Sequence, residues 1–163
     1  MSNERAEFSE FFQASWEPCL RAVVAVVGSQ QLAEDQVAEG FARAWASWRK
    51  VSRHPAPRAW VVRTALNTGA SWWHRRNREL PLAGHDLPAA QQAGVDAALL
   101  AALWRLPTRQ REVIALRIFL DLDTGTIAQQ LGIEAGTVRM HLSRGVAGLR
   151  RELILTNTTE ADL

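Results

Sequence analysis

Apolar residues recur at intervals of three and four positions along most of the chain, which is the spacing of amphipathic helices. We predict helices at residues Glu7–Val27, Gln31–Lys50, Pro57–Arg76, Val95–Leu106 and Arg109–Phe119, and two shorter helical segments on either side of Gly132. Gly28 is a natural helix end, and Pro57 suits a first helical turn because its missing N–H costs nothing there. No run alternates β-branched and polar residues in the manner of a half-buried strand. The pattern therefore predicts an all-α fold.

A change of composition at residues 80–94 divides the chain. Two prolines and two glycines interrupt the helical spacing there, in the stretch LPLAGHDLPAAQQAG. We predict that this stretch is a flexible linker between two small helical domains, an N-terminal helical bundle at residues 1–79 and a C-terminal helix-turn-helix domain at residues 95–155. The polar residues 156–163 predict a frayed tail.

Charge is unevenly distributed, although the formal net charge is only +2. The first 39 residues hold seven acidic and two basic residues, whereas residues 40–78 hold nine basic residues and no acidic one. A concentrated positive block of this kind is typical of a surface that binds phosphates, and a solvated basic face without a partner is the alternative.

Several function classes are disfavoured. The longest apolar run is far shorter than the roughly 20 residues that cross a bilayer, and no basic-then-apolar leader opens the chain, so we expect a cytoplasmic protein with no membrane partner. The single cysteine, Cys19, has no histidine or acid at metal-ligand spacing, and we expect it to be buried. The acidic pairs, Asp121 with Asp123 and Glu34 with Asp35, have no histidine, nucleophile or glycine-rich phosphate loop beside them. We predict no catalytic residue, metal, cofactor or small-molecule substrate, and hence no enzyme.

The helix predicted from Pro57 separates into two faces at about 100° per residue. One face is an apolar band that includes Trp72 and Trp73 and is expected to lie in the core. The opposite stripe is polar and basic apart from one tryptophan: Trp60, Arg63, Asn67, Ser71, His74 and Arg78. Guanidinium groups bind phosphates, asparagine pairs with base edges, and an aromatic ring stacks on a base. We predict that this stripe contacts a nucleic-acid strand, with a plain core role as the alternative for Trp60.

Residues 123–145, DTGTIAQQLGIEAGTVRMHLSRG, have the layout of a helix-turn-helix in which Gly132 supplies the left-handed residue of the turn. The second helix should bury four apolar residues, Val138, Leu142, Val146 and Leu149. The opposite side carries Thr137, Met140, Ser143, Arg144 and Arg151, with Arg139 and His141 on the flanks. A DNA major groove admits such a helix, and its N-terminal half would meet base edges. A plain pair of packed helices is the alternative, because any helical hairpin with a glycine turn can imitate this motif.

Three segments, taken in their order along the chain, resemble the bacterial sigma factors of the extracytoplasmic-function (ECF) type, and the resemblance covers nearly the whole chain. The segment AEDQVAEGFARAW (Ala33–Trp45) resembles the polymerase-binding helix of that family, RTALNTGASWWHRRNR (Arg63–Arg78) its minus-ten helix, and Leu106–Arg150 its minus-thirty-five reader. The resemblance implies an RNA polymerase sigma factor that directs promoter recognition and transcription initiation. Its implied partners are the RNA polymerase core, at the clamp of the beta-prime subunit, and promoter DNA, with an anti-sigma factor as a candidate inhibitor.

The resemblance also implies roles for individual residues. It assigns Asp35, Glu39 and Arg43 to polymerase binding and places Phe41 and Trp45 in the core of the same helix. To the minus-ten region it assigns Asn67 and four arginines, Arg63, Arg75, Arg76 and Arg78. To the minus-thirty-five element it assigns five residues on the second helix of the helix-turn-helix, Thr137, Arg139, Met140, His141 and Arg144.

The chain departs from the family pattern at several positions. Gln36 stands where leucine is usual, Ala38 where glutamine is usual, and Ser71 where aspartate is frequent. An acid is common at Thr126, and a serine cap at Glu134, so the second helix of the motif has a weaker start signal. Two other functions stay open at this point: a polymerase-independent helix-turn-helix regulator that binds duplex operators, and a sigma-like adaptor that acts through protein contacts. Pull-down of core polymerase would separate the first of these from a sigma factor.

Overall fold

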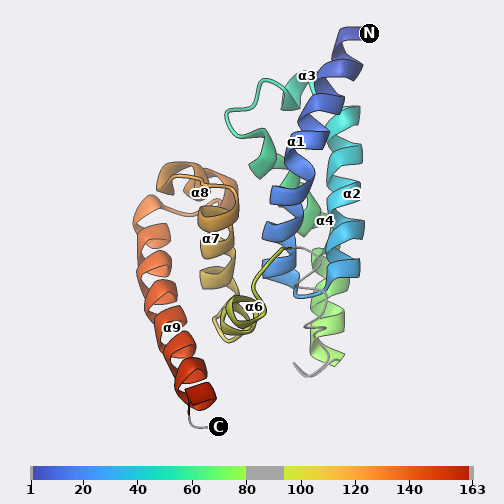
Figure 1. Ribbon diagram of the computed structural model, residues 1–163. Helices are drawn as coiled ribbons and strands as arrows, with labels where there is room; N and C mark the ends of the chain where they lie inside the picture. The colour runs from blue at the N-terminus through green and yellow to red at the C-terminus, as the bar shows by residue number, and fades with distance from the viewer. Residues whose placement is uncertain (1, 80–93, 162–163) are drawn as a thin grey trace.

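The computed structural model describes the backbone of residues 2–79 and 94–161 and, within these ranges, the side chains outside residues 69–79 and residue 160. Every regular element in this part is a helix, which confirms the predicted all-α fold (Figure 1). The helices are α1 (Ser2–Val27), α2 (Gln30–Ala46), α3 (Trp48–Val51), α4 (Pro57–Glu79), α6 (Ala97–Trp104), α7 (Thr108–Phe119), α8 (Thr124–Leu131) and α9 (Ala135–Ala161).

Local capping explains where the N-terminal helices begin and end. Gly28 follows α1 with φ +73°, a left-handed conformation that glycine adopts without strain. Ser29 caps α2, because its hydroxyl accepts the backbone N–H of Leu32 at 3.3 Å. At Ser47 the backbone leaves the helical region, so the single predicted helix Gln31–Lys50 is in fact two helices, α2 and α3.

The N-terminal bundle is formed by α1, α2 and α4, which pack against one another. Phe41 of α2 is 2% exposed and lies within a cluster of aromatic rings from α1, including Phe11 at 5.8 Å and Phe12 at 5.0 Å between ring centroids. Gly40 lets α2 and α4 approach closely, since a Cβ added there would lie 2.8 Å from the carbonyl oxygen of Val61. This crossing of α2 and α4 positions the candidate site.

In the C-terminal half, α8 and α9 form the predicted helix-turn-helix, which packs on α6 and α7. Gly132 ends α8 in the left-handed region with φ +65°. The Asp123 carboxylate caps the start of α8 by accepting the Thr126 N–H at 2.7 Å, and this bond is the main reason why the pKa of Asp123 is lowered.

Two expectations for α9 differ from the structure. Val138 and Leu149 are buried as predicted and Leu142 is half-buried, but Val146 is 38% exposed, because it lies about 80° around α9 from Val138, at the edge of the buried face. The helix also continues to Ala161, through most of the predicted frayed tail at 156–163. The hydroxyls of Thr156, Thr158 and Thr159 each donate to the carbonyl oxygen four residues earlier. Those bonds keep the threonine side chains compatible with a helix that projects beyond the C-terminal core.

The two halves contact each other through α1, which packs against α7 and α6 as well as against α2 and α4. Every residue from Ala22 to Val27 is buried, so this end of α1 is covered on all sides. Trp104 of α6 lies against Gly28, where an added Cβ would be 2.3 Å from its indole ring. The guanidinium of Arg111 lies 4.0 Å from the centroid of the same ring, and burial lowers the pKa of Arg111 to about 10. The predicted linker at 80–94 lies outside the described residues except for Gly94.

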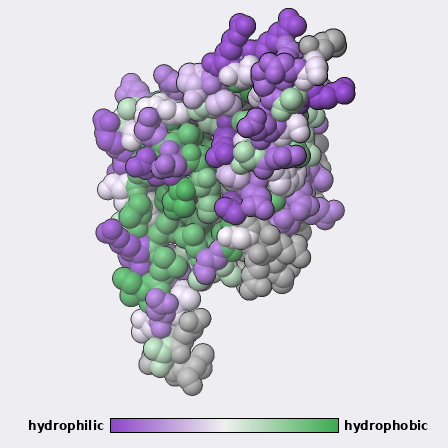
Figure 2. Space-filling view, turned by 45° about the horizontal axis from the view of Figure 1, so that its top comes forward, coloured by the Kyte–Doolittle hydropathy of each residue, from purple (hydrophilic) through white to green (hydrophobic). Residues whose placement is uncertain are grey.

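Figure 2 shows a continuous apolar area over the C-terminal helices, bordered by polar side chains, on the face turned toward the viewer. The large apolar side chains that the described part exposes in this half are Ile118, Met140, Val146, Ile154 and Leu155. Within the described ranges, no helix is both long and apolar enough to cross a membrane.

Candidate nucleic-acid interface

The first half of α4 has the two faces expected from its sequence. Val61, Val62 and Ala65 are at most 1% exposed and face the core of the bundle. Arg63 and Asn67 are exposed on the other side, and Trp60 is half-buried between the two faces. The side chains of Ser71, Trp72, Trp73, His74, Arg75, Arg76 and Arg78 lie outside the described residues, although the backbone of α4 continues through them to Glu79.

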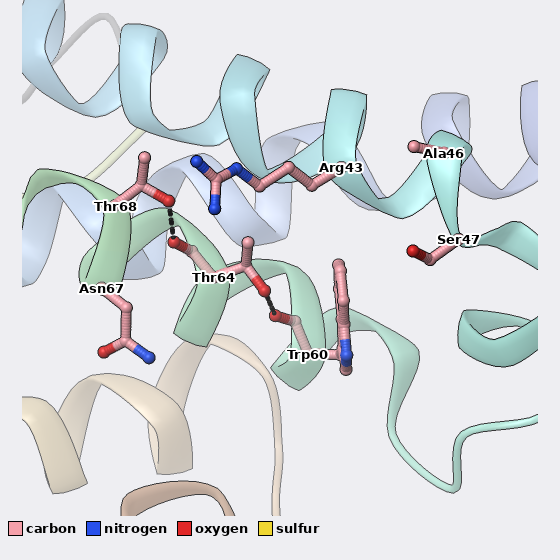
Figure 3. A pocket seen from close by; sticks show the side chains of 7 residues that line it. All are labelled: Arg43, Ala46, Ser47, Trp60, Thr64, Asn67 and Thr68. Atoms are coloured by element: carbon pink, nitrogen blue, oxygen red, sulfur yellow. Dashed lines mark hydrogen bonds between the residues drawn. The ribbon is translucent and has the colours of Figure 1, made fainter.

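An open pocket of about 580 Å³ lies between α2 and α4 (Figure 3). It is lined by Arg43, Ala46 and Ser47 from the end of α2, and by Trp60, Thr64, Asn67 and Thr68 from α4. This volume is within the range of roughly 300–1,000 Å³ typical of sites that bind small organic groups. The indole of Trp60 forms an aromatic wall at one end, which is the arrangement that base stacking requires. We refer to this cavity as the α2–α4 pocket.

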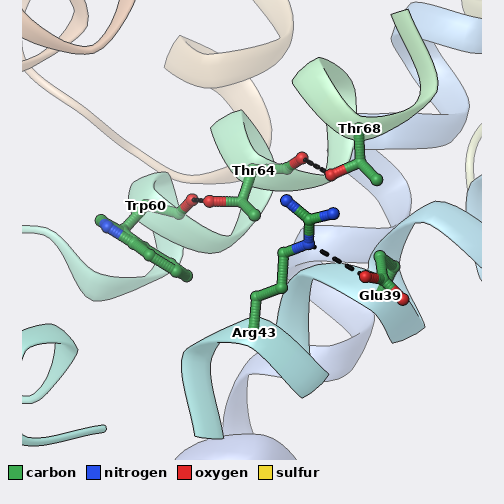
Figure 4. A network of polar contacts seen from close by, with 5 residues as sticks. All are labelled: Glu39, Arg43, Trp60, Thr64 and Thr68. Atoms are coloured by element: carbon green, nitrogen blue, oxygen red, sulfur yellow. Dashed lines mark hydrogen bonds and ion pairs between the residues drawn. The ribbon is translucent and has the colours of Figure 1, made fainter. Parts of the chain in front are cut away.

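The polar groups of the α2–α4 pocket are held in defined positions (Figure 4). The Thr64 hydroxyl donates to the carbonyl oxygen of Trp60 at 2.8 Å, and the Thr68 hydroxyl donates to that of Thr64 at 2.5 Å. Arg43 reaches across from α2 toward these threonines, while its Nε donates to Glu39 Oε1 at 2.9 Å. The ion pair leaves the terminal nitrogens of Arg43 directed toward α4, where a phosphate or a base edge can meet them.

Asn67 lines both the α2–α4 pocket and a second, smaller cavity. Its amide points away from Arg43, toward the C-terminal half (Figure 3). On that side Asn67 and Arg63 line a smaller cavity of about 180 Å³ together with residues of α7 and α8, among them Arg109 and Gln130. In this arrangement, part of the predicted DNA-contacting stripe of α4 faces the C-terminal half of the chain.

The three residues assigned to polymerase binding form an exposed stripe on α2. Asp35, Glu39 and Arg43 are spaced by four residues, and all three are exposed. Phe41 is buried on the opposite side as expected, but the expectation that Trp45 lies in the core is wrong, because Trp45 is 44% exposed. Its ring contacts Phe8 of α1 at 5.1 Å between centroids, at the edge of the aromatic cluster. Trp45 therefore belongs to the surface of α2.

The residues predicted to read DNA lie on α9 near its N-terminus. Arg139, Met140 and Arg144 are exposed, and Thr137 and His141 are half-buried. The inward side of the same turns is anchored by Val138, which is fully buried. Together these residues present a polar and basic surface on the part of the helix that a major groove would admit.

Three features of the site were not singled out from the sequence. Gly40 permits the close crossing of α2 and α4, and a glycine inside a helical pattern is a signal for such an approach. Ser47 and Thr64 line the α2–α4 pocket, but nothing in their spacing marks them, because the pocket exists only once two helices cross.

Among the described residues, no group of three or more histidine, cysteine, aspartate or glutamate side chains is arranged to hold a metal ion.

Comparison with known proteins gives matches over both halves of the chain. Residues 15–79 match the family model for Sigma-70 region 2, and residues 96–149 match the model for Sigma-70, region 4. The RNA polymerase sigma-E factor of Streptomyces coelicolor is 31% identical over 157 residues, which are 93% of this chain and 88% of that protein. The ECF RNA polymerase sigma factor SigL of Mycobacterium tuberculosis is 31% identical over 160 residues, which are 91% of this chain and 88% of that protein.

A solved structure supports the fold. The sigma factor RpoE from Bartonella quintana, in complex with the anti-sigma factor NepR, superposes with a TM-score of 0.71 and 22% sequence identity. The superposition covers 90% of this chain and 96% of that one. The arrangement of helices described above is therefore similar to the fold of that solved chain.

Proposed function

The chain belongs to the sigma-70 family as an RNA polymerase sigma factor of the ECF type, and on this premise we propose which helix binds each partner during promoter recognition. The acidic part of the exposed stripe of α2 binds the core polymerase at its beta-prime clamp, α4 binds the minus-ten element, and α9 binds the minus-thirty-five element. The protein acts on promoter DNA in the cytoplasm as an initiation factor and not as a catalyst. An anti-sigma factor that covers these surfaces is a further partner in this proposal.

The observation that carries the proposal for the minus-ten element is the α2–α4 pocket. It combines an aromatic wall, Trp60, with a guanidinium, Arg43, and Asn67 lines its edge with the amide turned toward the C-terminal half. A base turned out of the duplex can stack on the indole and use the polar groups for its edge or its phosphate. Arg43, assigned to the polymerase by resemblance, is thereby proposed to serve the DNA pocket, while Asp35 and Glu39 keep the polymerase role.

Energetics indicate why this pocket works as part of a polymerase complex. Duplex stacking averages about 1.4 kcal/mol per step, so opening roughly ten base pairs costs well over 10 kcal/mol. Stacking of a base on an aromatic side chain contributes about 1–3 kcal/mol. One pocket therefore captures a base and helps start the opening, and the channel of the core enzyme holds the open strands.

In vitro transcription with core polymerase on a genomic library, with transcript starts mapped, tests the function as a whole. Accurate initiation that depends on this chain is the expected result. Operator binding without any polymerase-dependent transcript would instead favour a duplex-binding regulator.

A second experiment tests the pocket itself. Asn67→Ala and Trp60→Ala should reduce permanganate reactivity of minus-ten thymines more strongly than they reduce binding to duplex promoter DNA, because base capture follows duplex binding. Asn157→Ala is the matched control, since Asn157 is an exposed asparagine near the end of α9. Unchanged permanganate reactivity in both pocket variants would contradict the assignment.

A further inference from the structure

A second basic cavity lies on the side of α9 and extends from Arg144, which is assigned to the minus-thirty-five element, toward the C-terminus of the helix. It has a volume of about 400 Å³ and is lined by polar side chains from three helical segments, Arg105, Gln110, Arg144, Arg151 and Glu152. Three guanidinium groups thus face one carboxylate. We refer to this cavity as the basic cleft.

Close packing and one ion pair hold the basic cleft in shape. A Cβ added at Gly148 would lie 2.6 Å from Leu106 Cδ2, so α9 and the segment between α6 and α7 touch at the floor of the cleft. Across it, Arg105 Nη1 donates to Glu152 Oε2 at 2.6 Å. The Glu152 side chain is 25% exposed and that of Arg105 is 66% exposed, so the carboxylate anchors the arginine stem while much of the guanidinium remains accessible.

Helix geometry aligns this cleft with the DNA-reading part of α9. Arg144 and Arg151 are seven residues apart, which is close to two full turns and places them about 20° apart around the helix. Met140 lies one turn before Arg144 on the same side. These residues therefore form one line along the surface of α9.

Distances along this line indicate what the basic cleft meets. With a rise of about 1.5 Å per residue, Arg151 lies roughly 16 Å along the axis from Met140. A recognition helix contacts base edges with its N-terminal residues, and in homeodomains the C-terminal end of that helix contacts the backbone. With Met140 and its neighbours at base edges, Arg151, about three turns further along α9, lies toward the sugar-phosphate backbone.

We propose that the basic cleft binds backbone phosphates of the DNA that borders the minus-thirty-five element, with Arg151 and Arg105 as the contacts. The proposal rests on the proposed function, since it presumes that α9 lies in the major groove of the promoter. Arg151 and Glu152 fall outside the region 4 match, which ends at residue 149. Arg105, Gln110 and Arg144 fall inside it, so the cleft spans the end of the matched region.

The test compares Arg151→Ala with Arg150→Ala in the holoenzyme formed with core polymerase. Arg150 is the matched control, because it is an exposed arginine next in sequence that does not line the cleft. Loss of one phosphate contact should reduce the slope of log K against log salt by about one. At 0.15 M salt it should weaken promoter binding roughly fivefold. The Arg150 variant should retain the wild-type slope, and Arg151→Lys should restore most of it.

Neutral methylphosphonate linkages locate the contact directly. Such a linkage beside the minus-thirty-five element should weaken binding of the wild-type holoenzyme but have no further effect on the Arg151→Ala holoenzyme. Accurate initiation combined with equal salt slopes for Arg151→Ala and Arg150→Ala would overturn the cleft alone. A chain that forms no holoenzyme would overturn the proposed function and the cleft together. A loss that varies with base sequence rather than with backbone charge would also overturn the cleft.

Discussion

Gln36 is a polar side chain buried in α2 at a position where an apolar residue would be expected. It is 5% exposed, and neither atom of its amide has a hydrogen-bond partner. A buried polar group without a partner costs about 1–3 kcal/mol. Gln36→Leu should therefore raise the free energy of unfolding by about 1–2 kcal/mol, seen as a higher urea midpoint at an unchanged slope.

Gln130→Leu is the control for this prediction. Gln130 is equally buried, at 6% exposed, but its amide nitrogen lies 3.5 Å from His54 Nε2. Its replacement should bring no comparable gain. If Gln36→Leu left the midpoint unchanged or lowered it, the unpartnered amide would not be the cost that its burial indicates.

Cys19 is a second residue whose surroundings determine its chemistry. Burial raises the pKa of its thiol from 9.0 to about 12, and the charge of Arg58 opposes the shift only in part. Because the raised pKa favours the neutral thiol, its contribution to stability is fully present below pH 9 and is lost as the pH rises toward 12. Native protein should resist alkylation at pH 8, whereas unfolded protein should react quickly.

Two measurements check this behaviour of Cys19. A Cys19→Ala variant should lose less stability than the wild type between pH 9 and 11, as followed by urea unfolding. Equal alkylation rates for native and unfolded protein would contradict a buried, protonated thiol.

At the scale of helices, the sequence predicts most of the helices but not how they pack against one another. Apolar spacing predicts the first part of α1, the first half of α4 and α7, because each buries one face there, and glycines mark the ends of α1 and α8. The break between α2 and α3 at Ser47 was missed, because the apolar spacing runs through it. The α2–α4 pocket could not be predicted, since the presence of Arg43 in it depends on the close crossing at Gly40.

The stripe on α2 leads to a prediction about polymerase binding. Asp35→Arg reverses the charge of an exposed residue in that stripe and should weaken retention of core polymerase roughly tenfold or more, because the carboxylate assigned to the interface is replaced by a longer cationic side chain. Circular dichroism should show unchanged helix content. Glu34→Arg makes the same charge change one position away, about 100° around the helix, and should leave retention near the wild-type value. Equal losses in the two variants would indicate a general electrostatic effect.

For the whole molecule, the contact between α1 and α7 sets a limit on promoter binding. The minus-ten and minus-thirty-five elements are about 25 base pairs apart, which is roughly 85 Å along B-form DNA. A compact chain of this length has a radius of gyration of about 15 Å, and hence a diameter of roughly 40 Å. If α4 and α9 bind the two elements as proposed, the arrangement in Figure 1 is too small to bind both at once, and we expect the two halves to separate when the promoter is engaged.

Energy transfer between two dyes measures this separation. Arg53→Cys and Arg150→Cys place labels on exposed positions in the N-terminal and C-terminal halves, in a Cys19→Ala background. Transfer should be high in the chain alone and should fall when core polymerase and promoter DNA are added together. A duplex that carries only the minus-thirty-five element should leave transfer unchanged. Low transfer in the chain alone would contradict the closed arrangement.

Separation of the two halves also affects the solubility of the chain, because of the valine-rich end of α1. Ala22–Val27 is covered on every side while the halves are together, partly by α7 and α6. Separation of the halves would expose these valine side chains to solvent, and exposed apolar patches of this kind promote self-association. A chain whose halves have separated is therefore expected to self-associate unless a partner covers this segment.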